Sequence, residues 1–174
     1  MNTVHASLDP SSWVVRWAPL VTRGPVLDVA SGSGRHARLF LQRKLAVTAV
    51  DREAQALPEG ITFVKADLED GSPWPFAGQT FGGIVVTNYL YRPVLPLLME
   101  ALDVQGVLIY ETFMVGNERF GKPSNPNFLL RPGELLQAFA GLSVVAFEQG
   151  RTDKAVVQRI CVIRGNAEGV RIPA

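Results

Sequence analysis

The sequence has a single cysteine, two histidines and no long run of apolar residues. The one cysteine, Cys161, cannot form a disulfide within the chain, and it lies in an apolar segment where a buried, unreactive thiol is expected. No segment is apolar for long enough to span a bilayer, and the N-terminus lacks the pattern of a signal peptide. These absences predict a cytoplasmic protein without membrane contact.

Basic tracts are missing as well. The 17 Lys and Arg residues and 16 Asp and Glu residues leave a formal net charge of +1, and both signs are spread along the chain. Proteins that depend on nucleic acid usually carry a basic arm or patch. No obligatory nucleic-acid partner is therefore expected, and no metal site is predicted.

The length of 174 residues and the hydrophobic fraction of 47% predict one globular domain. Residues 25–164 are expected to form its core, and residues 165–174 a tail. Residues 1–24 are expected to form an N-terminal helix with a flexible tail or small lid at residues 1–9. Serines cap this helix, whose apolar residues either pack on a sheet or roof a ligand pocket.

The most informative stretch of the chain runs from Pro25 to Ala37. Residues 26–30 are apolar enough for a strand that is covered on both faces. Residues 31–34 form a turn in which two glycines, one residue apart, let a ligand lie against the backbone. A helix over residues 35–44 directs its N-terminal N–H groups and its positive dipole end at the same place. The stretch predicts a nucleotide-type site in an α/β protein.

Two classes of ligand use such a turn, and one of them is a dinucleotide. Gly32, Gly34 and Ala37 fit the pattern G-x-G-x-x-[G/A], and Asp51 follows at a suitable distance. This reading leads to an NAD(P)-dependent oxidoreductase.

The other ligand class is S-adenosylmethionine, and Asp28 favours it. A carboxylate inside an apolar strand needs a partner, which a ligand ammonium group or the N–H groups of the turn would supply. The segment from Asp28 to Gly34 resembles the first motif of class I S-adenosylmethionine-dependent methyltransferases. Ala30 stands where that motif usually has its first glycine, which is a mild departure.

Acidic residues also follow the next two expected strands, at residues 45–50 and 61–66. Asp51 suits a ribose, because one carboxylate can accept protons from both hydroxyl groups. The resemblance implies that Asp67 reads the exocyclic amine of adenine and that a neighbouring backbone N–H, at Leu68, meets a ring nitrogen. The connection between these strands is short and allows only a turn or two of helix.

A loop rich in proline and glycine leads into the fourth expected strand, at residues 81–87. Residues 74–76, Trp-Pro-Phe, resemble a second signature of class I methyltransferases, although Gly82 stands where an aspartate is usual. Ligands of open α/β sheets lie beyond the carboxyl ends of the strands, at the point where the strand order reverses. Asn88 and Tyr89 are therefore expected to face the reacting centre, with Tyr91 close by.

A helix over residues 93–102 leads to the fifth expected strand, at residues 106–112. Glu111 ends this strand at the ligand edge, which makes it the first candidate for a general base. The polar segment 113–130 that follows is long for a compact domain, and such a loop is either functional or a solvated surface loop. If it is functional, Arg119 and Lys122 can hold an anionic acceptor.

The remaining elements are a helix over residues 132–140 and two strands, at residues 142–148 and 155–164. Their short polar connection predicts a hairpin. The expected fold is a Rossmann-like three-layer α/β sandwich with a mostly parallel, seven-stranded sheet and a C-terminal antiparallel hairpin. The region from Glu111 to Leu135 resembles small bacterial methyltransferases related to the tellurite-resistance group.

The sequence thus predicts an S-adenosylmethionine-dependent methyltransferase with a small-molecule acceptor. The alternatives are the oxidoreductase and a non-catalytic cofactor-binding domain on the same scaffold. The residues assigned to the cofactor are Asp28, Ala30, Ser31, Gly32, Ser33, Gly34, His36, Asp51, Arg52, Asp67, Leu68, Asn88 and Tyr89. The residues assigned to catalysis are Glu111 and Tyr91. The residues assigned to the acceptor are Arg92, Asn117, Arg119 and Lys122.

Overall fold

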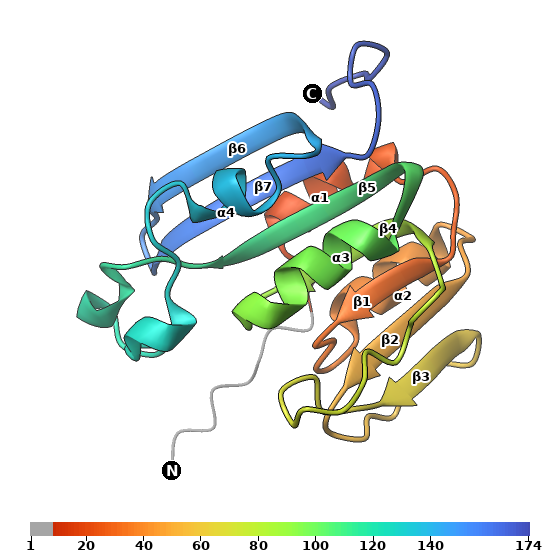
Figure 1. Cartoon of the computed structure of the whole chain (residues 1–174), viewed down its shortest axis with the longest axis horizontal. Coiled ribbons are helices and arrows are strands. Elements are labelled where there is room, and N and C mark those ends of the chain that lie inside the picture. Colours follow the sequence, from red (N-terminus) through yellow and green to blue (C-terminus); the bar gives the residue numbers. More distant parts are fainter. Residues whose placement is uncertain (1–8) are drawn as a thin grey trace.

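The computed structural model describes residues 9–174, and its elements follow one another as in Figure 1. The tail or lid expected before residue 9 lies outside the described residues. The strands are β1 (Val26–Val29), β2 (Val47–Asp51), β3 (Ile61–Lys65), β4 (Phe81–Thr87), β5 (Leu102–Phe113), β6 (Ser143–Arg151) and β7 (Val156–Ile163). The α-helices are α1 (Ser12–Trp17), α2 (Arg35–Gln42), α3 (Leu95–Ala101) and α4 (Glu134–Ala138). Four 3-10 turns, η1 (Ala18–Leu20), η2 (Arg92–Val94), η3 (Asn117–Arg119) and η4 (Pro126–Phe128), complete the described elements.

All seven of these strands belong to one sheet with the order β3-β2-β1-β4-β5-β7-β6. The neighbours from β3 to β5 are parallel, whereas β7 runs antiparallel to both β5 and β6. This arrangement confirms the predicted Rossmann-like sandwich and its C-terminal hairpin. The strand order reverses between β1 and β4. From β1 the chain proceeds to β2 and β3 at one edge of the sheet, and from β4 it proceeds to β5 and the hairpin at the other edge.

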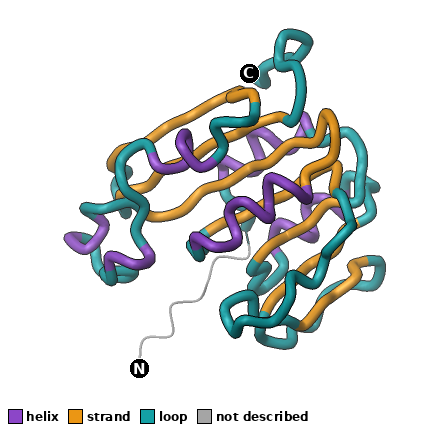
Figure 2. Tube along the Cα trace, viewed as in Figure 1, coloured by secondary structure: helices purple, strands orange, loops and turns teal. Residues whose placement is uncertain are grey.

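Helices cover both faces of the sheet (Figure 2). On one face α1 and α2 pack through Trp13, Trp17 and Phe40 against side chains of β1, β2 and β5. On the other face α3 and α4 contribute Leu98 and Leu135 to a second core. The central strands β1 and β4 are buried almost throughout, as the apolar runs of parallel strands with two covered faces require.

No helix connects β2 to β3 or β3 to β4 in the described structure. The segment after β3 instead runs as a loop, in which the ring of Trp74 meets Phe76 edge-on at 5.2 Å. Phe76 in turn meets Phe81 at 5.5 Å and is almost fully buried. These aromatic contacts replace the packing that a helix would supply, and they leave the tip of β3 accessible.

Element boundaries differ from the prediction at β5, which starts four residues earlier, at Leu102, and around the hairpin. The strands extend to Arg151 and start again at Val156, so that the connection is shorter than the predicted residues 149–154. Thr152 closes this turn, because its N–H donates to the carbonyl oxygen of Ala155 at 2.8 Å and its hydroxyl oxygen accepts from two backbone N–H groups.

Gly82 stands where the related signature usually has an aspartate, and the structure gives a steric reason. A Cβ atom at this position would lie 2.3 Å from the backbone oxygen of Arg23. Gly82→Ala is expected to lower the free energy of unfolding by about 1–3 kcal/mol, the usual cost of overpacking. Gly169→Ala is the matched control, since no atom lies within 4 Å of its Cβ position. Urea denaturation of both variants tests this, and equal stabilities would contradict the close contact.

Candidate functional site at the carboxyl ends of the strands

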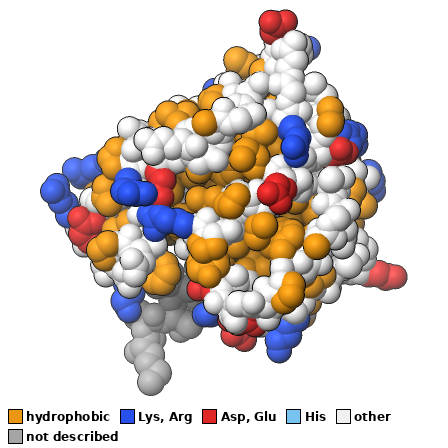
Figure 3. All heavy atoms as spheres, viewed as in Figure 1, with side chains coloured by type: hydrophobic (Ala, Val, Ile, Leu, Met, Phe, Trp, Pro, Cys, Tyr) orange, Lys and Arg blue, Asp and Glu red, His pale blue; other side chains and the backbone are white. Residues whose placement is uncertain are grey.

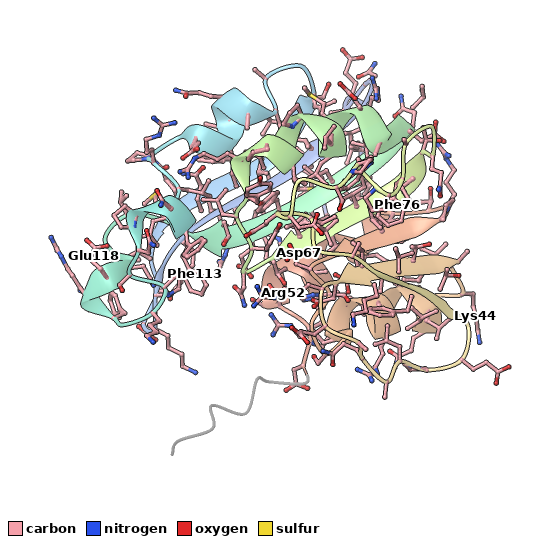
Figure 4. All side chains as sticks on the ribbon, turned by 60° about the horizontal axis from the view of Figure 1, so that its bottom comes forward. Lys44, Arg52, Asp67, Phe76, Phe113 and Glu118 are labelled. Carbon is pink, nitrogen blue, oxygen red and sulfur yellow. The ribbon has the colours of Figure 1, made fainter. Side chains whose placement is uncertain are left out.

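A cavity of about 400 Å³ opens where the parallel strands end. Its lining comes from the last residues of the five strands β1 to β5 or from the residues directly after them, together with two residues of the loop after β5. In Figure 4, Asp67 and Arg52 lie near the middle of this edge, and Phe113 lies to their left, on the side of Glu118. The lining residues are Ala30, Val50, Asp51, Arg52, Ala66, Asp67, Leu68, Glu69, Asn88, Tyr89, Leu90, Thr112, Phe113, Pro123 and Phe128.

The glycine turn follows directly on Ala30, at the rim of this cavity. Gly32 and Gly34 have φ values of 50° and 73°, in the left-handed region. A Cβ atom at Gly34 would also lie 2.3 Å from the side chain of Leu57, whereas nothing lies within 4 Å of one at Gly32. The backbone at Gly32 is therefore open to a ligand, as the sequence predicts for such a turn.

Ala30 itself has a φ of 51°, which a residue with a Cβ atom adopts only at a cost of about 1–2 kcal/mol. The usual glycine would avoid this strain, so the sequence departure at this position is visible in the backbone. The side chain of Ser31 next to it is buried, and its hydroxyl is without a hydrogen-bond partner among the described residues. An unpaired buried hydroxyl at the turn fits a polar ligand that would supply the missing partner.

Asp28 is buried in β1, and one of its carboxylate oxygens accepts the N–H of Ala37 at 2.9 Å. The sequence leaves open whether a ligand or the protein itself pairs with Asp28, and in the structure a backbone N–H of α2 does so. Burial raises the pKa of Asp28 to about 8, against the opposing effects of the Ala37 N–H and of Arg35. The carboxyl group therefore holds its proton over much of the neutral range.

This shift makes stability depend on pH. The folded state binds a proton at Asp28 up to about pH 8, whereas the unfolded chain loses it near pH 4. The free energy of unfolding is expected to fall as the pH rises between these values. Asp28→Asn should remove this slope. Its stability relative to the natural protein should therefore rise by about 4 kcal/mol between pH 5 and pH 9, since three pKa units lie between pH 5 and the folded value and each is worth about 1.4 kcal/mol. Thermal unfolding of both proteins across pH measures it, and parallel pH curves would contradict the shift.

Asp51 and Asp67, which the sequence assigns to the cofactor, both line the cavity. The Asp51 carboxylate accepts the Gly32 N–H at 2.8 Å and the Glu53 N–H at 2.9 Å, which ties the glycine turn to the tip of β2. Each carboxylate oxygen has a further lone pair that a ligand hydroxyl can use. Asp67 accepts the N–H of Glu69 at 2.9 Å and is exposed at the tip of β3.

Asn88 and Tyr89 also line the cavity, at the end of β4. The Asn88 backbone has a φ of 54°, and the backbone oxygen of Tyr89 accepts the hydroxyl of Tyr110 at 2.7 Å. Burial and the nearby Glu69 carboxylate raise the pKa of the Tyr89 hydroxyl well above its usual range, so that this group stays protonated.

Tyr91 lies beside a different hollow. This second hollow, of about 600 Å³, is bounded by the loop after β3 and the start of α3. It shares Arg52, Ala66, Asp67 and Leu68 with the main cavity. Tyr91 is absent from the lining of the main cavity. The geometry therefore gives no support to its assignment as a catalytic residue.

Glu111 and His36 do not line the cavity, and both contact Ser11, on the sheet face that α1 covers. The Glu111 carboxylate accepts the hydroxyl of Ser11 at 2.6 Å and forms an ion pair with Arg159. His36 accepts the backbone N–H of Ser11 at 3.0 Å, which places the ring proton toward Thr87. Burial, with a smaller effect of Arg35, lowers the pKa of His36 to about 4 and keeps it neutral. Both residues anchor the start of α1, so neither predicted role finds geometric support.

Two of the residues assigned to the acceptor hold the loop after β5 in place instead. The Arg92 guanidinium contacts Glu134 at 2.6 and 3.1 Å and donates to the backbone oxygens of Asn127 and Leu129. Asn117 is buried, donates to the Pro123 oxygen and accepts from the backbone of β7. These contacts position the loop rather than a ligand.

Arg119 and Lys122 are exposed on the same loop and do not line the cavity. Figure 3 shows Lys and Arg side chains on the outer surface at the left of the view, where this loop lies. The loop contributes Pro123 and Phe128 to the cavity, next to Thr112 and Phe113 of β5. Sequence reasoning missed these residues, although the length of the loop indicated that it covers the site.

No protein-family model and no curated protein matches the sequence. Solved structures do match, and the following three have low sequence identity to this chain. TehB from Haemophilus influenzae superimposes with a TM-score of 0.71 at 16% identity, over 89% of this chain and 62% of the TehB chain. This chain therefore spans less than two thirds of the length of TehB.

A Burkholderia thailandensis 1,6-didemethyltoxoflavin-N1-methyltransferase, crystallised with its substrate and S-adenosylhomocysteine, has a TM-score of 0.66 at 18% identity, covering 94% of this chain and 80% of that one. The glycopeptide N-methyltransferase MtfA, also complexed with S-adenosylhomocysteine, has a TM-score of 0.60 at 18% identity, covering 92% and 91%. These likenesses establish the fold, which is that of class I S-adenosylmethionine-dependent methyltransferases, and confirm the predicted resemblance at that level. None of the helices in residues 9–174 has the length and hydropathy that a membrane crossing needs.

Proposed function

We propose that this protein is an S-adenosylmethionine-dependent methyltransferase that acts on a small-molecule acceptor. One observation carries the proposal. The cavity brings Ala30, Asp51 and Asp67 together along the tips of three adjacent strands, in the order in which the methionine, ribose and adenine parts of the cofactor would follow. A dinucleotide site explains the glycine turn and Asp51, but it gives no reason for an acidic residue at Asp67.

The residues of the turn fit the cofactor chemically. The unpaired Ser31 hydroxyl and the open backbone at Gly32 suit the polar aminoacyl end, and Asp51 suits the ribose hydroxyls. Asp67 and the backbone at Leu68 suit the adenine ring, with Arg52 beside them. When bound, the cofactor supplies an electrophilic methyl group on a sulfonium centre. The leaving group is a neutral thioether, which needs no acid to protonate it.

The chain itself would then contribute alignment and exclusion of water. Tyr89 and Asn88 lie between the cofactor half of the cavity and the end of β5. Phe113 and Phe128 close the far side with apolar surface. A small acceptor held there would meet the methyl group in a dry environment. The structural neighbours that act on toxoflavin precursors or glycopeptides support a small-molecule acceptor by analogy.

Isothermal titration calorimetry separates this proposal from its rivals. S-adenosylhomocysteine is expected to bind with a dissociation constant in the micromolar range, typical of such sites, while NAD⁺ and NADP⁺ produce no heat of binding. Binding of a nicotinamide nucleotide instead would identify an oxidoreductase. A non-catalytic domain would bind S-adenosylhomocysteine yet release none from S-adenosylmethionine in a screen of small-molecule acceptors.

A further inference from the structure

Charge divides the cavity into two halves. All the charged residues that line it, Asp51, Arg52, Asp67 and Glu69, lie at the ends of β2 and β3. This is the half that the proposed function assigns to the ribose and adenine of the cofactor. The hydroxyl and amine groups of a nucleoside match such a wall, because carboxylates accept hydrogen bonds from them.

The other half of the cavity is uncharged and largely apolar, and two of its five residues are phenylalanines. It consists of Leu90 after β4, Thr112 and Phe113 at the end of β5, and Pro123 and Phe128 of the loop. Phenylalanine rings favour flat apolar partners through stacked or edge-to-face contacts. Under the proposed function this half is the place of the methyl acceptor, since it adjoins the point between β1 and β4 at which the strand order reverses.

Within residues 9–174 no cation faces this half. Arg119 and Lys122 do not line the cavity, and the guanidinium of Arg92 is engaged by Glu134 and by two backbone oxygens. An anionic acceptor would lose its hydration there without gaining an ion pair, and that loss is costly. The half is therefore suited to a neutral molecule.

Among residues 9–174, no carboxylate or imidazole belongs to this half, since the carboxylates of Asp51, Asp67 and Glu69 line the other half. The Glu111 carboxylate is engaged by Ser11 and Arg159, and His36 accepts the Ser11 N–H. Both residues lie on the face of the sheet that α1 and α2 cover. An alcohol or an alkylammonium acceptor must lose a proton before or during methyl transfer. A nucleophile in this half has to bring a lone pair that is already available at neutral pH.

From this division of the cavity, and resting on the proposed function, we infer that the acceptor is a neutral heteroaromatic molecule and that a ring nitrogen receives the methyl group. The nitrogen lone pair forms the new N–C bond while the S–C bond breaks, and the electron pair of that bond stays on sulfur as a neutral thioether. The ring takes up the positive charge, and a ring that carries an N–H loses that proton to water. Phe128 is the specificity-determining residue that this arrangement singles out, because it belongs to the loop and not to the sheet.

A panel of probes with one ring size tests the inference on the full-length protein. The probes are benzimidazole, benzimidazole-5-carboxylate, benzyl alcohol and benzylamine, each with S-adenosylmethionine. Benzimidazole is expected to be N-methylated with a kcat/KM about tenfold or more above each of the others, within the range that pocket contacts normally discriminate. Release of S-adenosylhomocysteine and mass spectrometry of the product report the reaction.

Variants of the loop sharpen the test. Phe128→Ala should raise KM for benzimidazole about fivefold or more without changing the affinity for S-adenosylhomocysteine, because one apolar contact in a pocket is worth about that much. Phe128→Lys should shift the preference toward benzimidazole-5-carboxylate. Phe120→Ala is the matched control, since Phe120 is a phenylalanine of the same loop that is also exposed, at 37% against 47% for Phe128, and does not line the cavity.

Faster turnover of the carboxylate, the alcohol or the amine than of benzimidazole would overturn the inference. So would S-adenosylhomocysteine binding without any methylation of benzimidazole, or an unchanged KM in Phe128→Ala. In each of these cases the cofactor site of the proposed function still stands, because cofactor binding is measured separately, and the wider acceptor screen decides whether methyl transfer does. Failure of S-adenosylhomocysteine to bind at all would defeat the proposed function itself.

Discussion

Replacing Asp51 with alanine should weaken binding of S-adenosylhomocysteine by about 100-fold. Two hydrogen bonds between ribose hydroxyls and a charged carboxylate are worth about 1.5 kcal/mol each at the lower end of their range, and about 1.4 kcal/mol is a factor of ten. The substitution also removes the acceptor for the Gly32 N–H at 2.8 Å, so the glycine turn loses its tie to β2. Calorimetric titration of both proteins with the same ligand measures the effect.

The neighbouring Glu53 provides the control for this substitution. Its side chain is exposed and does not line the cavity, and its backbone N–H still donates to Asp51 after truncation. Glu53→Ala should therefore bind S-adenosylhomocysteine as the natural protein does. An Asp51→Ala protein that is folded and binds within twofold of the natural affinity would remove Asp51 from the ribose site.

Replacing Arg92 with alanine should lower the free energy of unfolding by about 2–4 kcal/mol. The side chain of Glu134 is only 8% exposed, and its carboxylate would lose both contacts with the guanidinium, at 2.6 and 3.1 Å. Removing one partner of a buried pair costs about 3–5 kcal/mol, which we reduce because Arg92 is 36% exposed. The loop after β5 would also lose two backbone contacts.

Arg131→Ala is the matched control for this clamp, because Arg131 approaches the same carboxylate at 3.6 Å from a side chain that is 75% exposed. Such exposed pairs contribute about 0–1 kcal/mol, so little change is expected. Urea denaturation separates the two variants. Similar losses of stability in both would mean that the Arg92 contacts do not clamp the loop.

The ion pair between Arg92 and Glu134 also determines whether it stabilises the fold more at high or at low pH. Burial opposes ionisation of Glu134, but the Arg92 hydrogen bond and charge outweigh it and hold the pKa of Glu134 below its usual value. A depressed pKa stabilises the fold above the unfolded value, near 4.3, and this contribution disappears as the pH falls through the folded value. The difference in stability between the natural protein and Arg92→Ala should therefore narrow below about pH 4.

The strands of the central sheet could be predicted from the sequence because burial on both faces leaves an unmistakable apolar run. Phe81–Thr87 has the bounds that its residues predict, and the acids after the strands lie at the cavity as expected. The ligand edge follows from topology alone, since the carboxyl ends of parallel strands meet there. The position of these acids at the ligand edge can therefore be predicted from the local sequence.

The roles of Glu111 and Arg92 could not be predicted in the same way. Successive strand residues point to opposite faces, so a position at the end of β5 does not reveal which face a side chain takes. Thr112, one residue later, is the one that lines the cavity. Glu111 instead contacts Ser11, which precedes α1 and lies 100 residues earlier in the chain. Arg92 pairs with Glu134 across 42 residues, a contact that only the folded loop creates.

A crystal structure of the protein with S-adenosylhomocysteine tests the central claim most directly. The ribose hydroxyls should lie within hydrogen-bonding distance of the Asp51 carboxylate, the adenine amine beside Asp67, and the aminoacyl end against the backbone of Gly32 near the Ser31 hydroxyl. Electron density for the ligand anywhere other than along the tips of β1, β2 and β3 would contradict the account.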